Sequence, residues 1–289
     1  MSGEWFDWTW DPTLFAGAAE HYERGRLPYA PGLADAFAAA LALDGQGRLL
    51  DVGCGPGTVA LRLAHLFEEA VGVDADPDMV REAARLASER GIGNARWVCL
   101  RAEDLPAGLG GFRVVTFAAS FHWMDRPRVA ATVRDMLVDG GVVVHVDNRH
   151  QDSLAPSTDL PPVPDAEIDV LRRRYLGDDR RAGASIRNTS PSDEDDVFRN
   201  AGFAGPDVVV VPDGRVLARS VDDVVAATFS MSYMAPHLFG DRLGELEAEL
   251  RRVLEAAAGA GGSFGVRLPD NALKIWRHRP GRPGQGHGK

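Results

Sequence analysis

Apolar runs and amphipathic stretches alternate along the first half of the chain. The runs are largely apolar throughout, as in strands buried on both faces, and the stretches between them repeat apolar residues at helical spacing. One helix is well delimited, with Asp76 at its N-cap, Pro77 at its first position and Gly91 as its stop. This alternation predicts a parallel sheet with helices on both faces. The expected strands are 48–53, 70–75, 96–102, 113–120 and 142–148, and the other helices are 58–69 and 126–138.

The pattern changes after residue 148. A Pro-rich loop at 149–164 leads into a basic helix at 165–176, and Ser192 with Asp195 resembles a capping box that begins a helix ending at Gly202. Residues 281–289 are expected to form a disordered tail. The other expected elements are a strand at 207–211, a possible hairpin through 212–214 into 216–220, a helix capped by Ser220 that carries 229–239, a helix near 241–258 and a strand at 271–278.

Composition narrows the classes of function. The 289 residues are 45% hydrophobic along the whole length, which favours one elaborated domain over two. No apolar run approaches the roughly 20 residues that span a bilayer, and the beginning MSGEWFDWTW lacks a basic segment before an apolar core. We therefore expect a cytoplasmic protein, a monomer or homodimer, with no membrane partner. The net charge of −10, with dispersed acids, disfavours nucleic acid because basic surfaces bind phosphates.

The two cysteines indicate neither a disulfide framework nor a metal site. Cys54 and Cys99 are too few for such a framework, and no histidine or acid lies near them at the spacing of zinc ligands. We expect free thiols and no bound metal.

The turn at residues 49–57, LLDVGCGPG, suggests a ligand close to the backbone. Alternate glycines after a buried strand place N–H groups at the switch point of a doubly wound sheet. The dinucleotide pattern G-x-G-x-x-G would need a third glycine where this chain has Thr58. The spacing is instead D-x-G-x-G-x-G from Asp51 to Gly57, and a second acid, Asp74, closes the next strand. Two acids at neighbouring strand ends favour a cofactor site over a structural turn.

This spacing resembles that of the class I S-adenosylmethionine-dependent methyltransferases. The resemblance implies a doubly wound, Rossmann-like α/β fold: a seven-stranded, mostly parallel sheet with an antiparallel edge hairpin, an N-terminal helical cover and an inserted cap after the fifth strand. It also implies S-adenosylmethionine as cofactor, with Asp74 accepting hydrogen bonds from the ribose hydroxyls. Ala75 and Met79 would lie near the nucleoside, although Met79 fits a core position equally well. The implied turn residues are Asp51, Gly53, Cys54, Gly55 and Gly57.

Other segments resemble a small-molecule subgroup of these enzymes, which carries a His-Trp motif after the fourth strand. The N-terminal segment is expected to close the cofactor site through Tyr22 and Tyr29. The subgroup usually has an acid before AEDLP, where this chain has Arg101, so adenine contacts are assigned to Ala102 and Glu103. The resemblance covers roughly 15–280 and rests on FAGAAEHYERGRLPYAPGL at 15–33, AEDLP at 102–106, SFHWMD at 120–125 and AGF at 201–203.

The residues after the fourth strand are expected to face the reacting methyl group, because ligands lie beyond the carboxyl ends of the strands. Ser120 is assigned to the cofactor, and Phe121 and Trp123 to the substrate. His122 is the candidate base, since a histidine pKa near ~6.5 suits proton transfer at neutral pH. Alternatively, the His-Trp pair only shapes the site.

Other candidates lie on the fifth strand and in the expected lid helix. His145, Asp147 and His150 are rival bases, but a histidine inside an apolar strand is more often a hydrogen-bonded core residue. Tyr233 and His237 are candidate substrate contacts in the lid, where packing is the alternative role.

Together these features favour methyl transfer to a small, largely apolar acceptor in bacterial secondary metabolism. Two other classes stay open because the cofactor residues are the same in each: a non-methylating reaction such as a cyclisation, and a cofactor-binding partner without turnover. The expected organisation is a single domain over 1–280, with the cofactor-binding core at 45–148, cap and lid elements at 1–44, 149–200 and 220–258, and the tail beyond.

Overall fold

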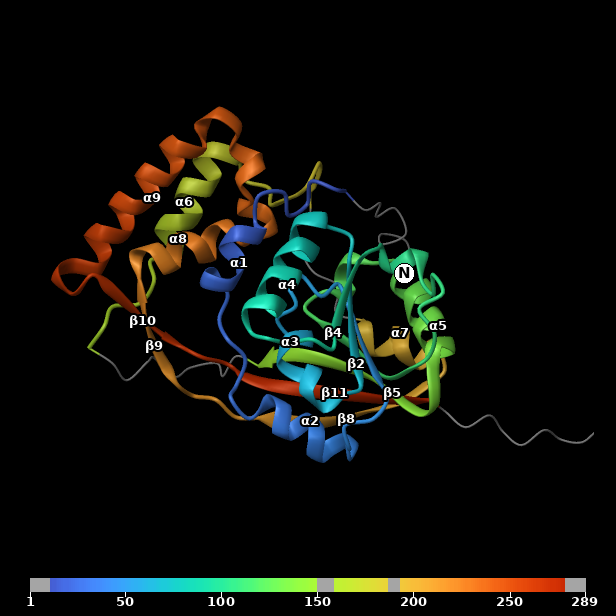
Figure 1. Ribbon diagram of the computed structural model, residues 1–289. Coiled ribbons are helices and arrows are strands. Elements are labelled where there is room, and N and C mark those ends of the chain that lie inside the picture. Colours follow the sequence, from blue (N-terminus) through green and yellow to red (C-terminus); the bar gives the residue numbers. More distant parts are fainter. Residues whose placement is uncertain (1–10, 150–158, 187–192, 279–289) are drawn as a thin grey trace, which may run out of the picture.

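The structure is a computed structural model that describes residues 11–149, 159–186 and 193–278 (Figure 1). Its main sheet consists of β1 (Arg48–Val52), β2 (Glu69–Asp74), β3 (Ala95–Cys99), β4 (Phe112–Ala118), β5 (Leu137–Arg149), β8 (Phe203–Val211) and β11 (Asp270–His278). The strand order is β3-β2-β1-β4-β5-β11-β8. Neighbours from β3 to β5 are parallel, whereas β11 runs antiparallel to both β5 and β8. The predicted doubly wound, mostly parallel sheet of seven strands is confirmed.

Adjacent residues of β1 enter opposite cores. Leu49 packs with Phe37 and Leu63 on one face of the sheet, and Leu50 packs with Val133 and Phe198 on the other. Successive side chains of a strand point to opposite faces, so both faces of the sheet are buried under helices. The first face carries α2 (Leu33–Leu41), α3 (Ala60–Leu63) and α4 (Pro77–Glu89), and the second carries α5 (Arg126–Met136) and α7 (Glu194–Asn200).

Helix α4 has the predicted boundaries, whereas α3 is shorter than predicted. Asp76 caps α4 by accepting hydrogen bonds from the N–H groups of Asp78 and Met79. The helix expected at 58–69 is only α3 followed by a 3-10 turn at Ala64–Leu66. The Asn94 side chain donates to the carbonyls of Ala64 and Phe67, which satisfies them without a further helical turn.

A second group of helices lies beside the sheet, at the upper left of Figure 1. We call this group the cap; its core includes Leu171, Phe229, Leu250 and Phe264. The cap is inserted at two places, after β5 and between β8 and β11. It consists of α6 (Asp165–Leu176), β9 (Val216–Ser220), α8 (Val221–Phe229), α9 (Leu243–Ala258) and β10 (Ser263–Arg267), with the turns between them.

The prediction of a possible hairpin through 212–214 is wrong. Strand β9 pairs with β10 in a separate two-stranded sheet, and β8 pairs with β11. The antiparallel pair at the sheet edge, formed by β8 and β11, is therefore not a local hairpin, because the cap lies between its two strands.

The expected lid helix carrying 229–239 is also wrong. Ser220 is the N-cap residue of α8 as predicted and forms a capping box with Asp223, but α8 ends at Phe229. Two 3-10 segments follow, at 232–234 and 236–242. Pro236 has no N–H to donate, and Gly240 has a left-handed φ of 51°, so a continuous helix is broken there. At α7 the N-cap is Asp193, and Ser192 lies outside the described residues, as does the tail.

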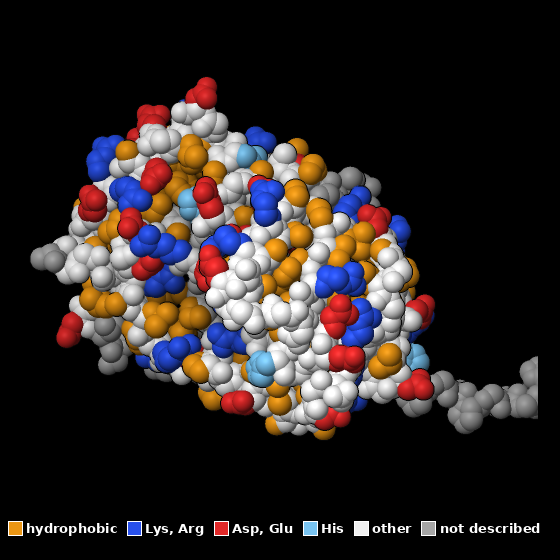
Figure 2. Space-filling model, in the orientation of Figure 1, with side chains coloured by type: hydrophobic (Ala, Val, Ile, Leu, Met, Phe, Trp, Pro, Cys, Tyr) orange, Lys and Arg blue, Asp and Glu red, His pale blue; other side chains and the backbone are white. Residues whose placement is uncertain are grey.

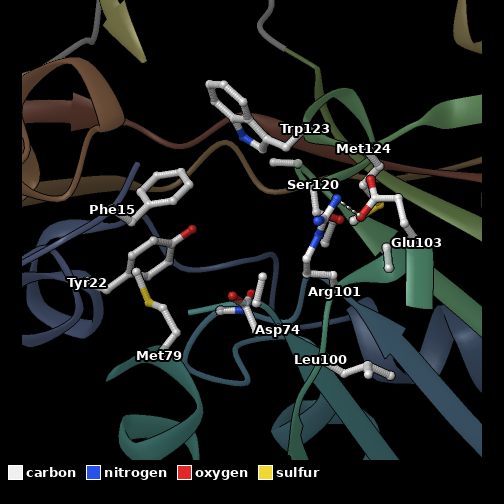
Figure 3. Close-up of a pocket in the computed structure, with 16 residues that line it drawn as sticks. Phe15, Tyr22, Asp74, Met79, Leu100, Arg101, Glu103, Ser120, Trp123 and Met124 are labelled. Carbon is white, nitrogen blue, oxygen red and sulfur yellow. Dashed lines mark hydrogen bonds and ion pairs between the residues drawn. The ribbon is translucent and has the colours of Figure 1, made fainter. Parts of the chain in front are cut away.

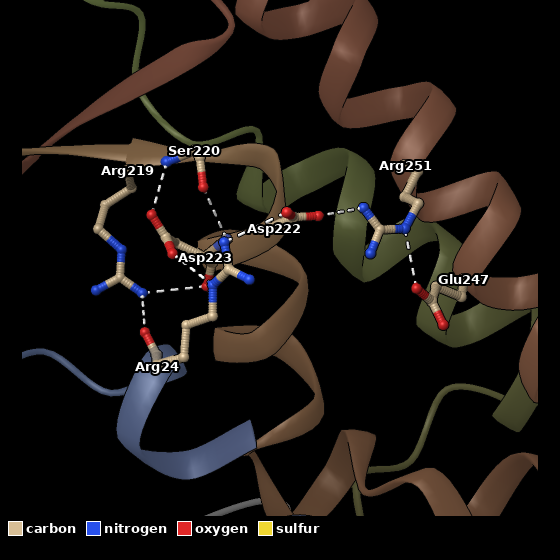
Figure 4. A network of polar contacts seen from close by, with 7 residues as sticks. All are labelled: Arg24, Arg219, Ser220, Asp222, Asp223, Glu247 and Arg251. Carbon is tan, nitrogen blue, oxygen red and sulfur yellow. Dashed lines mark hydrogen bonds and ion pairs between the residues drawn. The ribbon is translucent and has the colours of Figure 1, made fainter. Parts of the chain in front are cut away.

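Helix α1 (Ala19–Gly25) joins the cap to the sheet-bearing part of the chain (Figure 4). Arg219 is buried and donates to the carbonyls of Arg24 and Gly25 at the end of α1, at 2.8 and 3.0 Å, and to the carbonyl of Asp223. The Arg24 side chain donates to the Asp223 carboxylate at 2.8 Å. A Cβ at Gly25 would lie 2.4 Å from the Ala226 carbonyl, so the two helices approach closely.

On the face shown in Figure 2, acidic and basic side chains are interspersed over the surface. Within the described parts of the chain, no helix has the length and apolar character to cross a bilayer.

Candidate cofactor site

The glycine turn follows β1 and is tied to the end of β2. The N–H groups of Gly53 and Cys54 donate to the Val73 carbonyl at 2.8 and 3.0 Å. Gly53, Gly55 and Gly57 have φ values of 67°, 53° and 80°, in the left-handed region that favours glycine. The turn conformation therefore requires its alternate glycines.

Space around these glycines differs. A Cβ at Gly53 would lie 2.5 Å from the Cβ of Ser120, and one at Gly57 would lie 2.5 Å from the Trp97 ring. At Gly55 the nearest atom is Cζ of Tyr22, 3.9 Å away. Gly53 and Gly57 thus allow close packing, whereas the open side of Gly55 faces a cavity.

This cavity lies beyond the carboxyl ends of the central strands (Figure 3). Trp123, predicted as a substrate contact, lines it. The cavity is also lined by residues that were not predicted, namely Phe15, Leu100, Ala118, Ala119 and Met124, and by Arg101, which was treated only as a departure from the subgroup. Phe15, Arg101 and Met124 lie in or beside the quoted motifs, which could have indicated them. The predicted cofactor residues that line the cavity are Tyr22, Gly53, Gly55, Asp74, Ala75, Met79, Ala102, Glu103 and Ser120.

Asp74 places a carboxylate at this cavity, and Figure 3 shows it between Met79 and Arg101. Its oxygens accept from the N–H groups of Gly55 and Asp76 at 2.8 and 2.9 Å. Burial raises the pKa of Asp74 to about 6. A carboxylate accepts more than two hydrogen bonds, so Asp74 can also accept from hydroxyls of a ligand.

Asp51 supports the turn from behind. It is 1% exposed, accepts from the Thr116 hydroxyl at 2.8 Å and from the Ala60 N–H at 3.2 Å, and does not line the cavity. Gly57 packs on Trp97, and the buried Cys54 and the Tyr29 phenol also lie outside the lining. These four predicted cofactor residues position the site without forming its wall.

The N-terminal segment contributes Phe15 and Tyr22 to the cavity lining, whereas Tyr29, which was also expected to close the site, does not line it. Met79, 2% exposed, packs with Phe15 and Tyr22, and the Phe15 ring meets Trp123 edge to face with centroids 5.9 Å apart. The Arg26 guanidinium lies 4.8 Å above the Tyr22 ring and donates to the Ser230 carbonyl at 2.7 Å. The aromatic rings of Phe15, Tyr22 and Trp123 therefore line part of the cavity.

Glu103 is held at the opposite wall. Its carboxylate accepts from the Asp125 N–H at 2.9 Å and lies 3.4 Å from the Arg101 guanidinium. Apolar contacts around a ligand at this wall would come from Leu100, Ala102 and Met124.

The candidate base His122 does not line the cavity. Its half-buried ring lies against the Trp123 indole, with centroids 4.8 Å apart. Phe121 is 1% exposed in an aromatic cluster with Phe117 and Phe198, so it is core and not a cavity wall. The role of His122 as base stays a prediction.

His145 is a core residue, in accordance with the alternative given above. It is 2% exposed, and burial lowers its pKa to about 3. Its Nδ1 lies 3.5 Å from the Glu194 carboxylate. Because of the low pKa, the ring is neutral at ordinary pH, so this contact is not an ion pair. Asp147 pairs with Lys274 at 3.2 Å, and His150 lies outside the described residues.

The two lid candidates lie away from the cofactor cavity. Tyr233 lies under the Arg180 guanidinium at 4.8 Å, and His237 places Nδ1 3.2 Å from the Ala16 carbonyl. His237 lines a second cavity instead.

Comparison with known proteins gives the class of this site. Residues 49–141 match the family described as Methyltransferase domain. An uncharacterised methyltransferase of Bacillus subtilis is 34% identical over 104 residues, 36% of this chain and 41% of that protein. An uncharacterised methyltransferase of Mycobacterium bovis is 29% identical over 160 residues, 55% of this chain and 62% of that protein. The chain thus matches about half the length of these relatives.

Solved structures share the fold over most of the chain. A methyltransferase from Thiobacillus denitrificans in complex with S-adenosylhomocysteine aligns with a TM-score of 0.51 at 16% identity, covering 91% of this chain and 98% of that one. The (4+2)-cyclase SpnF aligns with a TM-score of 0.50 at 24% identity, covering 86% and 81%. The fold is that of the class I methyltransferases. Residues 49–141, which include the glycine turn and Asp74, thus form a segment similar to methyltransferase domains.

Proposed function

We propose that this protein transfers the methyl group of S-adenosylmethionine to a small, largely apolar acceptor in bacterial secondary metabolism. The observation that carries the proposal is the cavity where Gly55 and Asp74 meet, within the segment that matches the methyltransferase domain. The proposal includes a single domain, the subgroup with the His-Trp motif, a cytoplasmic location and a monomer or homodimer.

The residues at the cavity fit this cofactor. Because Gly55 has no side chain, a ligand can approach the turn backbone, and Asp74 can accept from both ribose hydroxyls. Leu100, Ala102 and Met124 would contact the adenine ring. S-adenosylmethionine, when bound, supplies an electrophilic methyl group on a sulfonium.

The protein's own contribution would be positioning and exclusion of water. Alignment of two reactants can lower the activation barrier by about 7–11 kcal/mol. The leaving group of a sulfonium is a neutral thioether, so it needs no acid catalyst. Phe15 and Trp123 would shield the methyl group from water. His122, next to Trp123, is the candidate base, and its ring would have to turn into the cavity to take the proton of the attacking group.

Purified protein incubated with methyl-labelled cofactor and a bacterial metabolite extract, followed by mass spectrometry, tests the proposal. Label in a small molecule together with S-adenosylhomocysteine is the expected result. A changed metabolite with neither label nor S-adenosylhomocysteine would instead indicate a cyclisation or a related reaction. Neither change, with cofactor bound, would indicate a binding partner without turnover. The likeness to a cyclase concerns the fold and does not favour the second outcome.

A further inference from the structure

A second cavity lies between the cap and the N-terminal segment. One wall is the end of α6, with Tyr175 and Leu176, and another is the short hairpin of β6 (Arg181–Ala182) and β7 (Ser185–Ile186). The turn after α8 contributes His237 and Leu238.

The N-terminal segment separates this second cavity from the cofactor cavity. Thr13 lines the second cavity, and Phe15, two residues later, lines the cofactor cavity. The Ala16 carbonyl holds His237, and the Asp11 carboxylate accepts from the N–H of Ala184 in the hairpin. A molecule lying along this segment would therefore contact both cavities.

Arg181 gives the second cavity an available positive charge. The nearby arginines of α6 are engaged, Arg172 and Arg173 with Asp169 and Arg174 with Glu249. Within the described parts of the chain, no acid pairs with the exposed Arg181.

The Asp11 carboxylate, which contacts the hairpin at Ala184, forms no ion pair with Arg181 in the described parts of the chain. Asp11 is occupied by the Ala184 N–H and by the N–H and hydroxyl of Thr13, the last two at 2.8 and 2.7 Å. A guanidinium recognises a carboxylate through paired, charge-assisted hydrogen bonds. The cavity can therefore take an anion.

His237 is oriented by the backbone. Its Nδ1 lies 3.2 Å from the Ala16 carbonyl, which can only accept, so Nδ1 carries the proton. The Tyr175 ring, Leu176 and Leu238 supply apolar surface beside these polar groups. The lining thus combines one cationic group with an apolar wall.

We propose that the second cavity binds the acid group of the methyl acceptor, which makes the acceptor a small carboxylate with an apolar body. The acid lies beside Arg181, and the rest of the molecule extends past Phe15 towards the cofactor cavity. This inference rests on the proposed function and names the substrate class for it.

The test measures carboxylate binding to protein saturated with S-adenosylhomocysteine. The probes are 4-hydroxyphenylacetate, indole-3-acetate and decanoate, each compared with its neutral amide by calorimetry. At least one carboxylate is expected to bind, with its amide bound at least tenfold more weakly. Arg181→Gln should weaken the binding of that carboxylate at least tenfold. Arg173→Gln, which removes the same charge from an exposed position of the cap, should leave it unchanged.

Three results would overturn the inference: no probe binds, amides bind as well as carboxylates, or Arg181→Gln binds like the wild type. His237→Gln provides a second variant and should also weaken the carboxylate, with its folding checked by thermal denaturation. S-adenosylhomocysteine affinity is measured on the same samples. If the cofactor product binds but carboxylates do not bind selectively, the inference about the second cavity is refuted and the proposed function is not. If the wild type binds no S-adenosylhomocysteine, the proposed function itself is refuted.

Discussion

The carboxylate of Asp74 accepts a hydrogen bond from the N–H of Gly55 at 2.8 Å. The acid that ends β2 and the glycine with the open side thus belong to one unit at the cofactor cavity. Asp74 keeps acceptor capacity for a ligand while it fixes the turn that the ligand would contact. Changing either residue should alter cofactor binding.

Asp74→Ala should weaken the binding of S-adenosylmethionine by about 1–3 kcal/mol, because the ribose hydroxyls lose their charged acceptor. Isothermal titration calorimetry measures the change. Asp78→Ala is the control, since Asp78 lies four residues after Asp74 in the first turn of α4, does not line the cavity and pairs with the exposed Arg81. Equal affinities of Asp74→Ala and wild type would contradict the assignment.

Cofactor affinity should fall as the pH drops below about 6. Burial raises the pKa of Asp74 to about 6, so below this pH the free protein holds a protonated carboxyl that ligand hydroxyls bind less well. The charged form favours binding, so affinity is full above this pKa and declines up to tenfold per pH unit below it. Titrations from pH 5 to 7.5 on wild type and Asp74→Asn check this. The pKa of Asp51 is also raised to about 6, but it is common to both proteins, so a profile equally steep in Asp74→Asn would exclude Asp74 as the cause.

Two glycines of the turn should respond differently to alanine. Gly57→Ala puts a methyl group 2.5 Å from the Trp97 ring at a φ of 80°, so the free energy of unfolding should fall by about 1–3 kcal/mol. Gly55→Ala has room for its Cβ, although the left-handed φ of 53° still strains alanine, so it should cost less stability than Gly57→Ala and the main loss should be cofactor affinity. Urea denaturation and calorimetry on both variants separate the effects. The reverse order of effects would mean that Gly55 does not face the ligand.

His145→Phe should reduce the loss of stability in acid. The His145 pKa of about 3 lies below the ordinary 6.5, so on acidification the unfolded chain takes up the proton first. The stability this group contributes is complete above about pH 6.5 and is lost towards pH 3, by about 1.4 kcal/mol per pH unit. Between pH 6.5 and 5 wild type should therefore lose about 2 kcal/mol more than His145→Phe in urea denaturation.

Glu194 acts with the opposite sign in both proteins. Burial raises its pKa to about 7, so its contribution is lost as the pH rises through that value. Because both proteins retain Glu194, the comparison of His145→Phe with wild type largely removes its effect. Parallel stability curves for the two proteins would show that His145 does not titrate in this range.

Arg219→Met should loosen α1 from the cap. The guanidinium is buried and donates to three carbonyls, so its loss should lower the free energy of unfolding by about 2–3 kcal/mol. Cofactor affinity should fall too, because α1 carries Tyr22. Arg252→Met removes an exposed arginine of α9 and serves as the control. Identical stabilities of the two variants would refute the role of Arg219.

The sequence predicted the strands and helices that are marked by residues within or next to them. Apolar runs located β1 to β5, and the Asp76 and Pro77 cap located the start of α4. The pairing of β9 with β10 joins strands separated by two helices, and no turn sequence indicates it. The lid helix was overpredicted because apolar spacing continues through Pro236, where the backbone cannot remain helical.

The site was predictable in its outline but not in the orientation of each side chain. Asp51 and Asp74 both end strands beside the turn, yet only Asp74 lines the cavity. Asp51 turns inward because Thr116 of β4 donates to it, and a partner so distant in sequence cannot be inferred from the motif. Phe15 and Met124 line the cavity from segments whose packing the sequence alone does not establish.

The place of β11 in the sheet has a consequence for protein synthesis. This strand follows every other described strand along the chain, yet it lies between β5 and β8 and carries the fully buried Trp276, whose ring stacks on Phe198. A nascent chain therefore leaves the ribosome with β5 and β8 unjoined until residues 270–278 emerge. During that interval two strand edges and the Phe198 ring stay exposed, which makes the unfinished polypeptide a substrate for chaperones and prone to aggregation.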